Sequence, residues 1–300
     1  EVFEEFLESN DLGIEIVVVT ETEPLGTGGA ISHVLSELTS GPNDPVLVFN
    51  GDVLTGVDIA QLVRAHQDVD ADVTLYLTPV EDPRAYGLVP IDDSGRVTAF
   101  LEKPQTPQEI ITDTINAGCY VFRRSVIDAI PTGRVVSVER ETFPGLLADG
   151  ALVTGVVDRG YWLDLGTPLA FARGSADLVL GQAPSPAVPE TGPFLALPTA
   201  QIATDAVLAE GTTIGRAAVV ESGAQVQGSV VFDGAVIERG AKVRNSIVGV
   251  GARIGADTVL DGVVIGDRAR IGAGNELLPG VRVWPDAELT ECSVRFSSDR

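Results

Sequence analysis

Hydrophobic positions divide this chain into two parts with different periodicity. In the first part, short apolar runs alternate with segments in which apolar residues recur every three or four positions. The runs predict strands over 14–19, 46–49 and 72–77, and the periodic segments predict helices over 28–38 and 59–67. The run over 46–49 is continuous, as in a strand buried on both faces. This alternation predicts parallel strands joined by crossover helices, and therefore an α/β domain.

The first seven residues have the pattern of the last turns of an amphipathic helix. Val2, Phe3, Phe6 and Leu7 fall on one face, and no capping residue precedes them. The 300 residues also contain no methionine. We therefore expect the chain to be truncated at its N-terminus.

Prolines mark the boundary between the two parts. Five of them fall between Gln182 and Pro198, a density that excludes a helix or a central strand. We therefore predict an incomplete α/β domain over residues 1–180, a linker over 181–198 and a second domain over 199–300.

Aliphatic residues recur through this second domain every five or six positions. Twelve of the fifteen spacings are six residues and three are five, with glycines and small residues between them. The repeating positions are Ile202, Leu208, Ile214, Val220, Val226, Val231, Ile237, Val243, Val248, Ile254, Leu260, Ile265, Ile271, Leu277, Val283 and Leu289. One inward side chain per hexapeptide, with three hexapeptides per turn, predicts a triangular parallel β-helix of about five turns. Because such a stack has open ends, we expect a homo-oligomer formed through it.

Charge and composition exclude several classes of function. The net charge of −23 argues against a surface for nucleic acid or an anionic membrane. No apolar run reaches the roughly 18 residues that span a bilayer, and no segment resembles a signal peptide. The two cysteines, Cys119 and Cys292, match neither a disulfide framework nor a metal-binding spacing, and we expect both to be buried and inert. These features predict a cytoplasmic protein.

Two carboxylates are the best candidates for metal ligands. Asp52 follows an apolar strand and a glycine, and Asp164 lies where a β-rich run meets a Gly-Thr-Pro helix start. Carboxylates from two strand ends suit a Mg²⁺ ion that keeps phosphate oxygens and waters as its other ligands. Both residues could instead cap the N-terminus of a helix.

Three further features fit a phosphorylated sugar or a nucleotide. Lys103 follows Glu102, so the pair offers a charge to a phosphate and an acceptor to a hydroxyl, although an exposed ion pair has the same spacing. Asn116 could bond sugar hydroxyls or serve as a turn residue. The glycine-rich turn Leu25–Ala30 lets a base or a phosphate approach the backbone.

Seven motifs follow one another in a recognisable order. They are Leu25-Gly26-Thr27, Phe49-Asn50-Gly51-Asp52, Tyr86-Gly87, Phe100-Leu101-Glu102-Lys103-Pro104, Ile115-Asn116-Ala117-Gly118, the segment from Ser137 to Pro144 with Glu139 and Glu141, and Trp162-Leu163-Asp164-Leu165-Gly166-Thr167-Pro168. With the hexapeptide repeats after them, the chain resembles the sugar-phosphate nucleotidyltransferases, most closely the mannose-1-phosphate guanylyltransferases. The resemblance covers nearly the whole chain. It implies a Rossmann-like nucleotidyltransferase domain, incomplete at its N-terminus, before a left-handed parallel β-helix.

The resemblance also implies a role for each matching residue. Asp52 and Asp164 would hold the catalytic Mg²⁺, and Lys103 would contact the sugar 1-phosphate. The residues implied to bind the sugar hydroxyls are Gly87, Glu102 and Asn116, and those implied to contact the nucleotide base are Leu25, Gly26 and Thr27.

The implied reaction is in-line attack of a sugar 1-phosphate on the α-phosphorus of a nucleoside triphosphate, which releases pyrophosphate. GTP and mannose 1-phosphate match the motif pattern best. Glucose 1-phosphate with another nucleotide stays open as an alternative, as does a non-catalytic relative that senses nucleotide sugars. Acyltransferases with the same β-helix need a histidine on the helix, and both histidines, His33 and His66, lie before it.

One motif of the family is not found in these 300 residues. The family begins with a strand leading to G-x-G-T-R-L, followed by a Lys-Pro pair, and these bind the triphosphate. We therefore expect the chain as given to be inactive and poorly soluble, with a long apolar sheet edge exposed.

Overall fold

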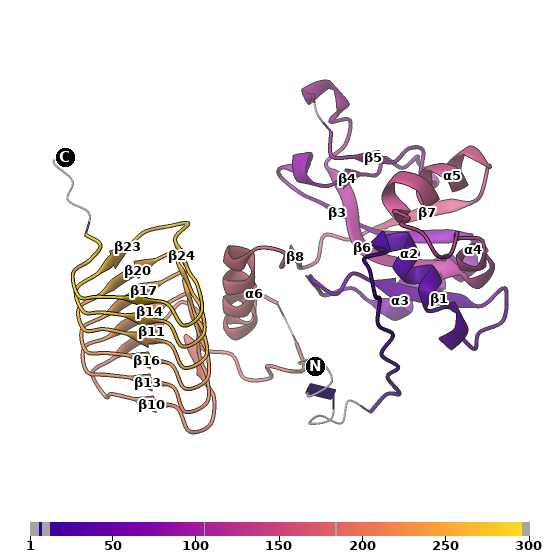
Figure 1. Cartoon of the computed structure of the whole chain (residues 1–300). Coiled ribbons are helices and arrows are strands. Elements are labelled where there is room, and N and C mark those ends of the chain that lie inside the picture. Colours follow the sequence, from indigo (N-terminus) through magenta and orange to yellow (C-terminus); the bar gives the residue numbers. More distant parts are fainter. Residues whose placement is uncertain (1–5, 8–12, 105, 184, 296–300) are drawn as a thin grey trace. The chain divides into compact units, whose positions relative to one another are not determined.

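The computed structural model describes residues 6–7, 13–104, 106–183 and 185–295 (Figure 1). Contacts divide the chain into two compact units. The first unit comprises Glu1–Asn50 and Asp58–Arg159, and the second comprises Gly51–Val57 and Gly160–Arg300. The short segment Gly51–Val57 therefore belongs to the second unit, although it lies in sequence between the two parts of the first.

The first unit is built on a six-stranded mixed sheet. Its strands run in the order β5-β4-β6-β3-β7, and β1 pairs with the C-terminal half of β6. The strands are β1 (Pro45–Phe49), β3 (Val73–Pro79), β4 (Gly87–Leu88), β5 (Leu101–Glu102), β6 (Thr114–Arg123) and β7 (Val153–Val157). Among these described strands only β3 and β7 pair in parallel. The predicted strands at 46–49 and 72–77, which are β1 and β3, do run in the same direction, with helix α3 (Ile59–Asp68) between them. They are not neighbours, because β6 lies between them and pairs antiparallel with both, so the sheet is mixed and not all-parallel.

Short helices connect the strands of the first unit. They are α2 (Gly26–His33), α3 (Ile59–Asp68), α4 (Arg124–Asp128) and α5 (Phe143–Ala148), with single turns η1 (Leu35–Glu37), η2 (Pro83–Ala85), η3 (Pro107–Glu109) and η4 (Val138–Thr142). Asp58 caps α3 by accepting a hydrogen bond of 2.9 Å from the Gln61 amide. The rings of Tyr120, Phe122 and Phe143 pack against one another in the core, and those of Phe122 and Phe143 are stacked. The predicted helices over 28–38 and 59–67 are present with shifted ends.

Two predictions near the N-terminus have different outcomes. Most of the helix predicted over residues 1–7 lies outside the described residues. Phe6 and Leu7 are described, and both are helical. The strand predicted over 14–19 is wrong: this segment is irregular, and Ile14 is 73% exposed. A β-strand needs a neighbour that accepts and donates its backbone hydrogen bonds, and no described segment pairs with residues 14–19.

Strand β1 lies at an edge of the sheet. One side of it pairs with β6, and no described strand pairs with the other side. Leu47 and Phe49 are 38% and 43% exposed, so the prediction that this run is buried on both faces is wrong. The described edge of the sheet at β1 is therefore apolar and partly exposed over five residues, which is shorter than the long edge that we expected.

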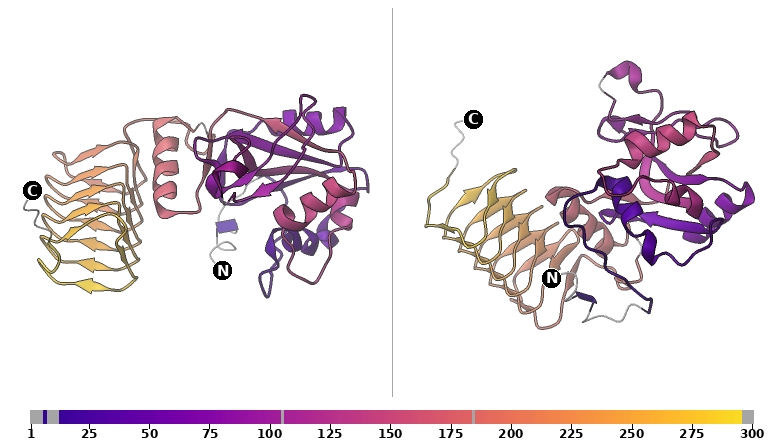
Figure 2. Two further views of the ribbon diagram at one scale, coloured as in Figure 1. Left: turned by 90° about the horizontal axis from the view of Figure 1, so that it is seen from above. Right: turned by 45° about the vertical axis from the view of Figure 1, so that its right-hand side comes forward.

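The second unit begins with a two-stranded ribbon and a helix. Strand β2 (Val53–Thr55) pairs antiparallel with β8 (Trp162–Asp164), and helix α6 (Pro168–Leu180) follows β8 directly. Thr167 caps α6 at its start, and Gly181 ends it in the left-handed conformation with a φ of 77°. Helix α6 lies alongside the coils of the solenoid described next (Figures 1 and 2).

The rest of the second unit is a parallel β-solenoid of about six turns, consistent with the predicted left-handed β-helix. Three flat sheets form its sides. Their strands are β9 (Phe194–Ala196), β10 (Gln201–Ile202), β11 (Val207–Ala209), β12 (Thr212–Ile214), β13 (Val219–Val220), β14 (Gln225–Gln227), β15 (Val230–Val231), β16 (Val236–Ile237), β17 (Lys242–Arg244), β18 (Ile247–Val248), β19 (Arg253–Ile254), β20 (Val259–Asp261), β21 (Val264–Ile265), β22 (Arg270–Ile271), β23 (Glu276–Leu277), β24 (Arg282–Val283) and β25 (Glu288–Leu289). The extra turn beyond the predicted five includes β9, which lies within the proline-rich segment and pairs with β12 at the end of its sheet.

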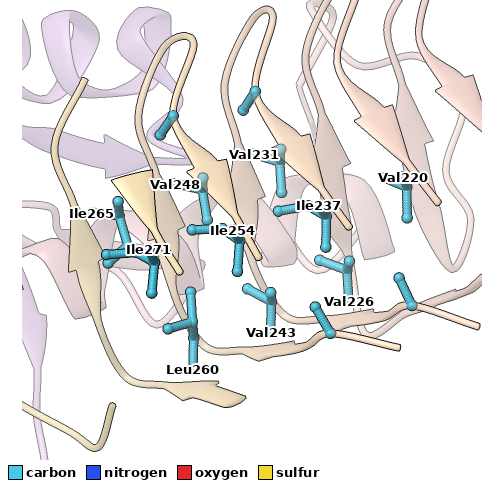
Figure 3. Packing of buried hydrophobic residues seen from close by; sticks show 14 of the residues in the cluster. Val220, Val226, Val231, Ile237, Val243, Val248, Ile254, Leu260, Ile265 and Ile271 are labelled. Atoms are coloured by element: carbon cyan, nitrogen blue, oxygen red, sulfur yellow. The ribbon is translucent and has the colours of Figure 1, made fainter. Parts of the chain in front are cut away.

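The repeating aliphatic residues fill the interior of the solenoid. Those from Ile214 to Leu277 are at most 2% exposed and point into one continuous core (Figure 3). The four at the ends of the stack, Ile202, Leu208, Val283 and Leu289, are partly buried. The hexapeptide pattern therefore predicted the inward face correctly at each of these positions.

Buried serine hydroxyls lie at two of the three short spacings, those after Val226 and Val243. At these corners the Ser246 amide donates to Ser229 Oγ over 3.1 Å, and the Val263 amide donates to Ser246 Oγ over 3.0 Å. The paired residues are 17 positions apart, which is the period of the shortened coils. Each hydroxyl thus satisfies a buried amide of the next coil, where an unpaired group would cost about 1–3 kcal/mol.

The two cysteines differ in their surroundings. Cys119 is buried in β6, where burial raises its thiol pKa to about 12, so the thiol stays protonated and unreactive. Cys292 is exposed. The prediction of burial is wrong for Cys292, because it follows the last described strand, where no further coil covers it.

Candidate functional site

The ribbon β2–β8 brings the two predicted metal ligands together. Asp52 directly precedes β2, Asp164 ends β8, and the register pairs Val53 with Asp164. The Leu165 amide donates to the Asp52 carbonyl over 2.8 Å, which extends the pairing by one step. Two residues more than a hundred positions apart in the sequence are thereby fixed at the same end of one ribbon.

Gly166 leaves the space between these carboxylates open. A Cβ at this position would lie 2.9 Å from Asp164 Oδ1 and 3.8 Å from Asp52 Oδ2. The Gly166 amide donates to Asp164 Oδ1 over 2.7 Å and orients that carboxylate. Two carboxylate oxygens around a small unfilled space fit a hard divalent cation that takes its other ligands from phosphate and water.

Neither carboxylate caps a helix. Thr167 caps α6 by accepting from the Ala170 amide, and Asp58 caps α3. This rules out the alternative interpretation of Asp52 and Asp164 as helix caps. Among the described residues no third histidine, cysteine or acidic side chain completes a three-residue metal cluster with them, so a metal held here would be bound by two protein carboxylates.

Gly87 and Glu102 face each other in the first unit. They are paired residues of the antiparallel strands β4 and β5. A Cβ at Gly87 would lie 2.9 Å from Glu102 Oε2 and 2.9 Å from the Phe100 ring. Glycine is therefore required here because the carboxylate and the aromatic ring both approach the backbone closely.

Lys103 stands beside this pair in an unusual backbone conformation. Its φ is 50°, in the left-handed region, and its amide donates to the Tyr86 carbonyl over 3.1 Å. Its Nζ lies 4.0 Å from Glu102 Oε1 and its side chain is 57% exposed, so this contact contributes little to stability. Backbone strain of this kind costs about 1–3 kcal/mol and is concentrated at functional sites.

The Glu102 carboxyl lies in an environment that favours its neutral form. Burial raises its pKa first, and the nearby negative charge of Glu139 raises it further. The positive charges of Lys103 and Arg140 oppose this shift and lower the pKa. A ligand hydroxyl that donates to the carboxylate would stabilise the charged form.

A bulge in β6 holds Asn116. Between the pairs Leu75–Tyr120 and Leu77–Asn116, strand β6 contains two more residues than β3. The bulge includes Gly118, whose φ is 75°, and a Cβ there would lie 2.9 Å from the Asn50 amide nitrogen.

Both ends of the Asn116 side chain are oriented by the bulge. Its Nδ2 donates to Tyr120 Oη over 2.8 Å, and its Oδ1 accepts from the Gly118 amide over 3.2 Å. Each end keeps one further hydrogen-bonding position for a ligand. Asn116 is thus an oriented donor and acceptor, not only a turn residue.

The glycine-rich turn packs against residues 134–136. A Cβ at Gly26 would lie 2.7 Å from the Val136 carbonyl, and the Gly28 amide donates to that same carbonyl over 2.8 Å. These glycines are therefore required by packing within the protein. The expectation that they are there to admit a ligand lacks support from this geometry, although Leu25 and Thr27 lie at the same helix start.

Glu139 is a residue that sequence reasoning left without a role. Its Oε2 accepts from Thr27 Oγ1 over 2.8 Å and from Ser137 Oγ over 2.7 Å. Its charge also acts on the pKa of Glu102 and of buried Tyr120, raising both. Glu139 thus contacts the turn at Leu25–Thr27 through Thr27, and its charge acts on Glu102. The only sequence signal was an acidic pair in the segment from Ser137 to Pro144.

An α/β sheet unit followed by a parallel β-solenoid is the arrangement that the resemblance to nucleotidyltransferases with a β-helix implied. The family model of the nucleotidyl transferases matches residues 1–179, and that of the GMPPB C-terminal domain matches residues 190–296. The chain belongs to the nucleotidyl transferase family, as the seven motifs indicated.

Two relatives illustrate the match. The chain is 54% identical over 301 residues to the mannose-1-phosphate guanylyltransferase of Mycobacterium tuberculosis, covering 99% of this chain and 82% of that protein. It is 37% identical over 168 residues to the mannose-1-phosphate guanylyltransferase catalytic subunit beta of Drosophila pseudoobscura pseudoobscura, covering 56% of this chain and 44% of that protein. Among solved structures, HddC from Yersinia pseudotuberculosis matches with a TM-score of 0.48 and 25% identity over 57% of this chain and 70% of that one.

Proposed function

We propose that the protein transfers a guanylyl group from GTP to mannose 1-phosphate, giving GDP-mannose and pyrophosphate. The observation that carries the proposal is the open space at Gly166 between two carboxylates, in a chain 54% identical over nearly its whole length to an enzyme of that name. An acceptor phosphate oxygen attacks the α-phosphorus of the nucleotide, and the bond to the leaving pyrophosphate breaks. No protein nucleophile is needed, so positioning and charge neutralisation supply the acceleration.

Asp52 and Asp164 are the proposed ligands of the metal. Nucleotidyltransferases of this family generally use a divalent metal, and oxygen-only donors favour Mg²⁺. The bound ion would neutralise charge on the phosphates of the nucleotide. The two aspartates would supply the negative charge that retains such an ion, and the Gly166 amide fixes the orientation of the Asp164 carboxylate.

Four residues of the first unit form the proposed site for the sugar phosphate. Lys103 supplies a partly exposed positive charge for the phosphate. Glu102 and Asn116 offer oriented acceptors and a donor to the hydroxyls, and Gly87 leaves the room that Glu102 occupies. We add Glu139 to this group, because its second carboxylate oxygen has no hydrogen-bond partner among the described residues and its charge reaches Glu102.

The turn at Leu25, Gly26 and Thr27 is the proposed contact with the guanine base. The Thr27 hydroxyl donates to Glu139 and accepts from the Val138 amide over 3.0 Å. Because that hydroxyl is already used in both directions, the contact with the base falls to the main chain of this turn. A backbone contact would tolerate Thr27→Ser and be lost when the turn is displaced.

The domain boundaries, the oligomeric state, the class of partner and the location of the protein are proposals as well. We propose a catalytic domain over 1–180, a linker over 181–198 and a β-helix over 199–300 through which the protein forms a homo-oligomer. The net charge of −23 supports small-molecule substrates in place of nucleic acid or membrane. A cytoplasmic location is proposed because the sequence has no apolar run of bilayer length, no segment like a signal peptide and no disulfide framework.

A pyrophosphate-release assay tests the function. The protein, expressed from the whole of its natural gene, is given Mg²⁺ with each of GTP, ATP, UTP and dTTP against mannose 1-phosphate and glucose 1-phosphate. We expect the highest kcat/KM for GTP with mannose 1-phosphate. A higher value for any glucose 1-phosphate pair would contradict the proposed substrates. Binding of GDP-mannose without turnover of any pair would instead show a non-catalytic protein.

A further inference from the structure

The proposed metal ligands belong to the same compact unit as the solenoid. The ribbon that carries Asp52 and Asp164 contacts one side of helix α6 through Leu54, Leu163 and Leu165. These leucines converge on Gly174: a Cβ there would lie 2.7 Å from Leu165 Cδ2 and 3.3 Å from Leu163 Cδ2. A glycine inside a helix costs about 1 kcal/mol relative to alanine, and here the close approach of the ribbon explains it.

The far end of the ribbon is also attached to α6. The Gly56 amide donates to the Tyr161 carbonyl over 3.0 Å and closes the ribbon. Tyr161 Oη donates to Asp177 Oδ2 over 2.7 Å, and Asp177 is a buried residue of α6. The ribbon is therefore held to the helix at both of its ends.

The solenoid contacts α6 just as closely. Gly211, in the turn between β11 and β12, has a φ of 74°, and a Cβ there would lie 2.5 Å from the Ala176 carbonyl oxygen and 2.6 Å from Ala176 Cα. Ser175 Oγ lies 3.1 Å from Thr213 Oγ1 on β12. The atoms of α6 that contact Gly211 belong to the helix backbone. A side chain added at position 211 could therefore not be accommodated by a rotamer change in α6.

An aromatic stack extends this contact. The rings of Phe171 on α6 and Phe232 on the solenoid lie 6.3 Å apart with an interplanar angle of 13°. Figures 1 and 2 show α6 running alongside the coils, as these contacts require. Gly174 thus allows the ribbon, and Gly211 the solenoid, to pack closely against the backbone of α6.

We propose that the solenoid coil at Gly211 positions the metal carboxylates through α6. Protein interiors are close-packed and transmit small displacements, and groups that orient metal ligands alter metal affinity about 10–100-fold when changed. A shift of α6 away from the solenoid displaces Leu163 and Leu165, the two neighbours of Asp164. The solenoid is then a support for the reaction centre as well as a possible oligomerisation domain. This inference rests on the proposed role of Asp52 and Asp164 as metal ligands.

The test compares two glycines of the solenoid. Gly211→Ala adds a Cβ against the backbone of α6, whereas Gly223→Ala, at a similar φ of 69°, finds no atom closer than 3.9 Å. Both substitutions place an alanine at a similar positive φ and so carry similar backbone strain. A difference between their Mn²⁺ affinities therefore reports the steric contact of the new Cβ with α6. Mn²⁺ binding is measured by calorimetry in the absence of turnover, beside the KM for mannose 1-phosphate.

We expect Gly211→Ala to weaken Mn²⁺ binding about tenfold and leave the KM for mannose 1-phosphate unchanged. Gly223→Ala is expected to bind Mn²⁺ like the wild type. Equal weakening in both variants, or a folded Gly211→Ala protein with unchanged Mn²⁺ affinity, would overturn the proposal.

A second variant covers the case in which Gly211→Ala does not fold. Thr213→Val removes the hydrogen bond to Ser175 without adding backbone strain, and we expect it to weaken Mn²⁺ binding about twofold to threefold, less than Gly211→Ala does, because only one side-chain hydrogen bond is lost. An unchanged affinity in this variant would count against the proposal.

The wild type and Asp164→Asn separate this inference from the proposed function. If the wild type binds Mn²⁺ and Asp164→Asn does not, the metal pair stands, and the glycine variants decide the inference alone. If the wild type binds no Mn²⁺, both the metal pair and the inference fail.

Discussion

The solenoid and the sheet of the first unit differ in how far apart along the chain their paired strands lie. In the solenoid each strand pairs with one about a single coil away, as Gln225 does with Lys242. In the sheet, β1 pairs with β6 across most of the first unit, as Phe49 does with Cys119. Short-range pairing repeats one local rule, whereas long-range pairing depends on segments that meet only after folding.

This difference explains where prediction from sequence succeeded. Each inward position of the solenoid follows from its neighbour one hexapeptide earlier. In the sheet, the local pattern of 46–49 indicated a buried strand, but its burial depended on which strands lie beside it. The two units also differ in their proposed roles. The proposed metal ligands belong to the solenoid unit, and the proposed sugar ligands belong to the sheet unit.

The largest expected effect concerns the metal pair of the solenoid unit. Asp52→Asn removes one of two anionic ligands and should lower kcat/KM by about 10³-fold, since metal-ion stabilisation is worth several kcal/mol. Asp58→Asn is the matched control, because asparagine caps a helix as well as aspartate does. The pyrophosphate assay and thermal unfolding check both variants. Similar activity in the two would show that Asp52 holds no catalytic metal.

A core substitution tests whether the two units unfold separately. Ile254 is fully buried between neighbouring coils of the solenoid. Ile254→Ala should cost about 2–5 kcal/mol of unfolding free energy by loss of buried methylenes and creation of a cavity. Hydrogen exchange should show lower protection in the coils and unchanged protection in β3 and β6. The control Val250→Ala, at a 46% exposed position, should change stability by less than about 0.5 kcal/mol. Loss of protection in the sheet as well would mean that the units unfold as one.

A smaller effect is expected at the sugar-binding side of the sheet unit. In Gly87→Ala the new methyl group meets Phe100 and Glu102, and we expect the KM for mannose 1-phosphate to rise about tenfold. Mn²⁺ affinity should not change, because the metal pair is in the other unit. Gly145→Ala, where nothing lies within 4 Å of the new Cβ, is the matched control. A rise in KM for both variants would remove the steric explanation.

The smallest expected effect is a change in pH dependence. Glu139 raises the pKa of Glu102, so Glu139→Gln should lower that pKa. Protonation of Glu102 removes a charged acceptor, so mannose 1-phosphate binding weakens as pH falls through this pKa. We therefore expect the acid limb of 1/KM to move to lower pH in the variant.

Glu141→Gln is the control for this pH experiment. Glu141 pairs with Arg134 over 2.9 Å and does not contribute to the pKa shift of Glu102. It should leave the acid limb where the wild type has it. An acid limb that stays in place in Glu139→Gln as well would show that another group controls it.

The candidate site was predictable from sequence to a limited depth. Asp52 and Asp164 were chosen because each follows a strand, and the family motifs supported the choice. Their common position at the end of one ribbon came from the pairing of β2 with β8 across more than a hundred residues. The contacts of Glu139 with Thr27 and Ser137 also join distant segments, so no local pattern signalled them.

The sequence by itself determined the solenoid, its inward residues and the family, because these follow from spacings within one coil and from motifs read in order. Only the tertiary structure decided that antiparallel β6 lies between β1 and β3, that residues 14–19 form no strand and that β1 lies at an edge of the sheet. It also decided that Gly174 of α6 lies against the ribbon and that Gly211 of the solenoid lies against α6. The physical reason is that backbone pairing and close packing are properties of two segments together, and a segment read alone records only its own half of the contact.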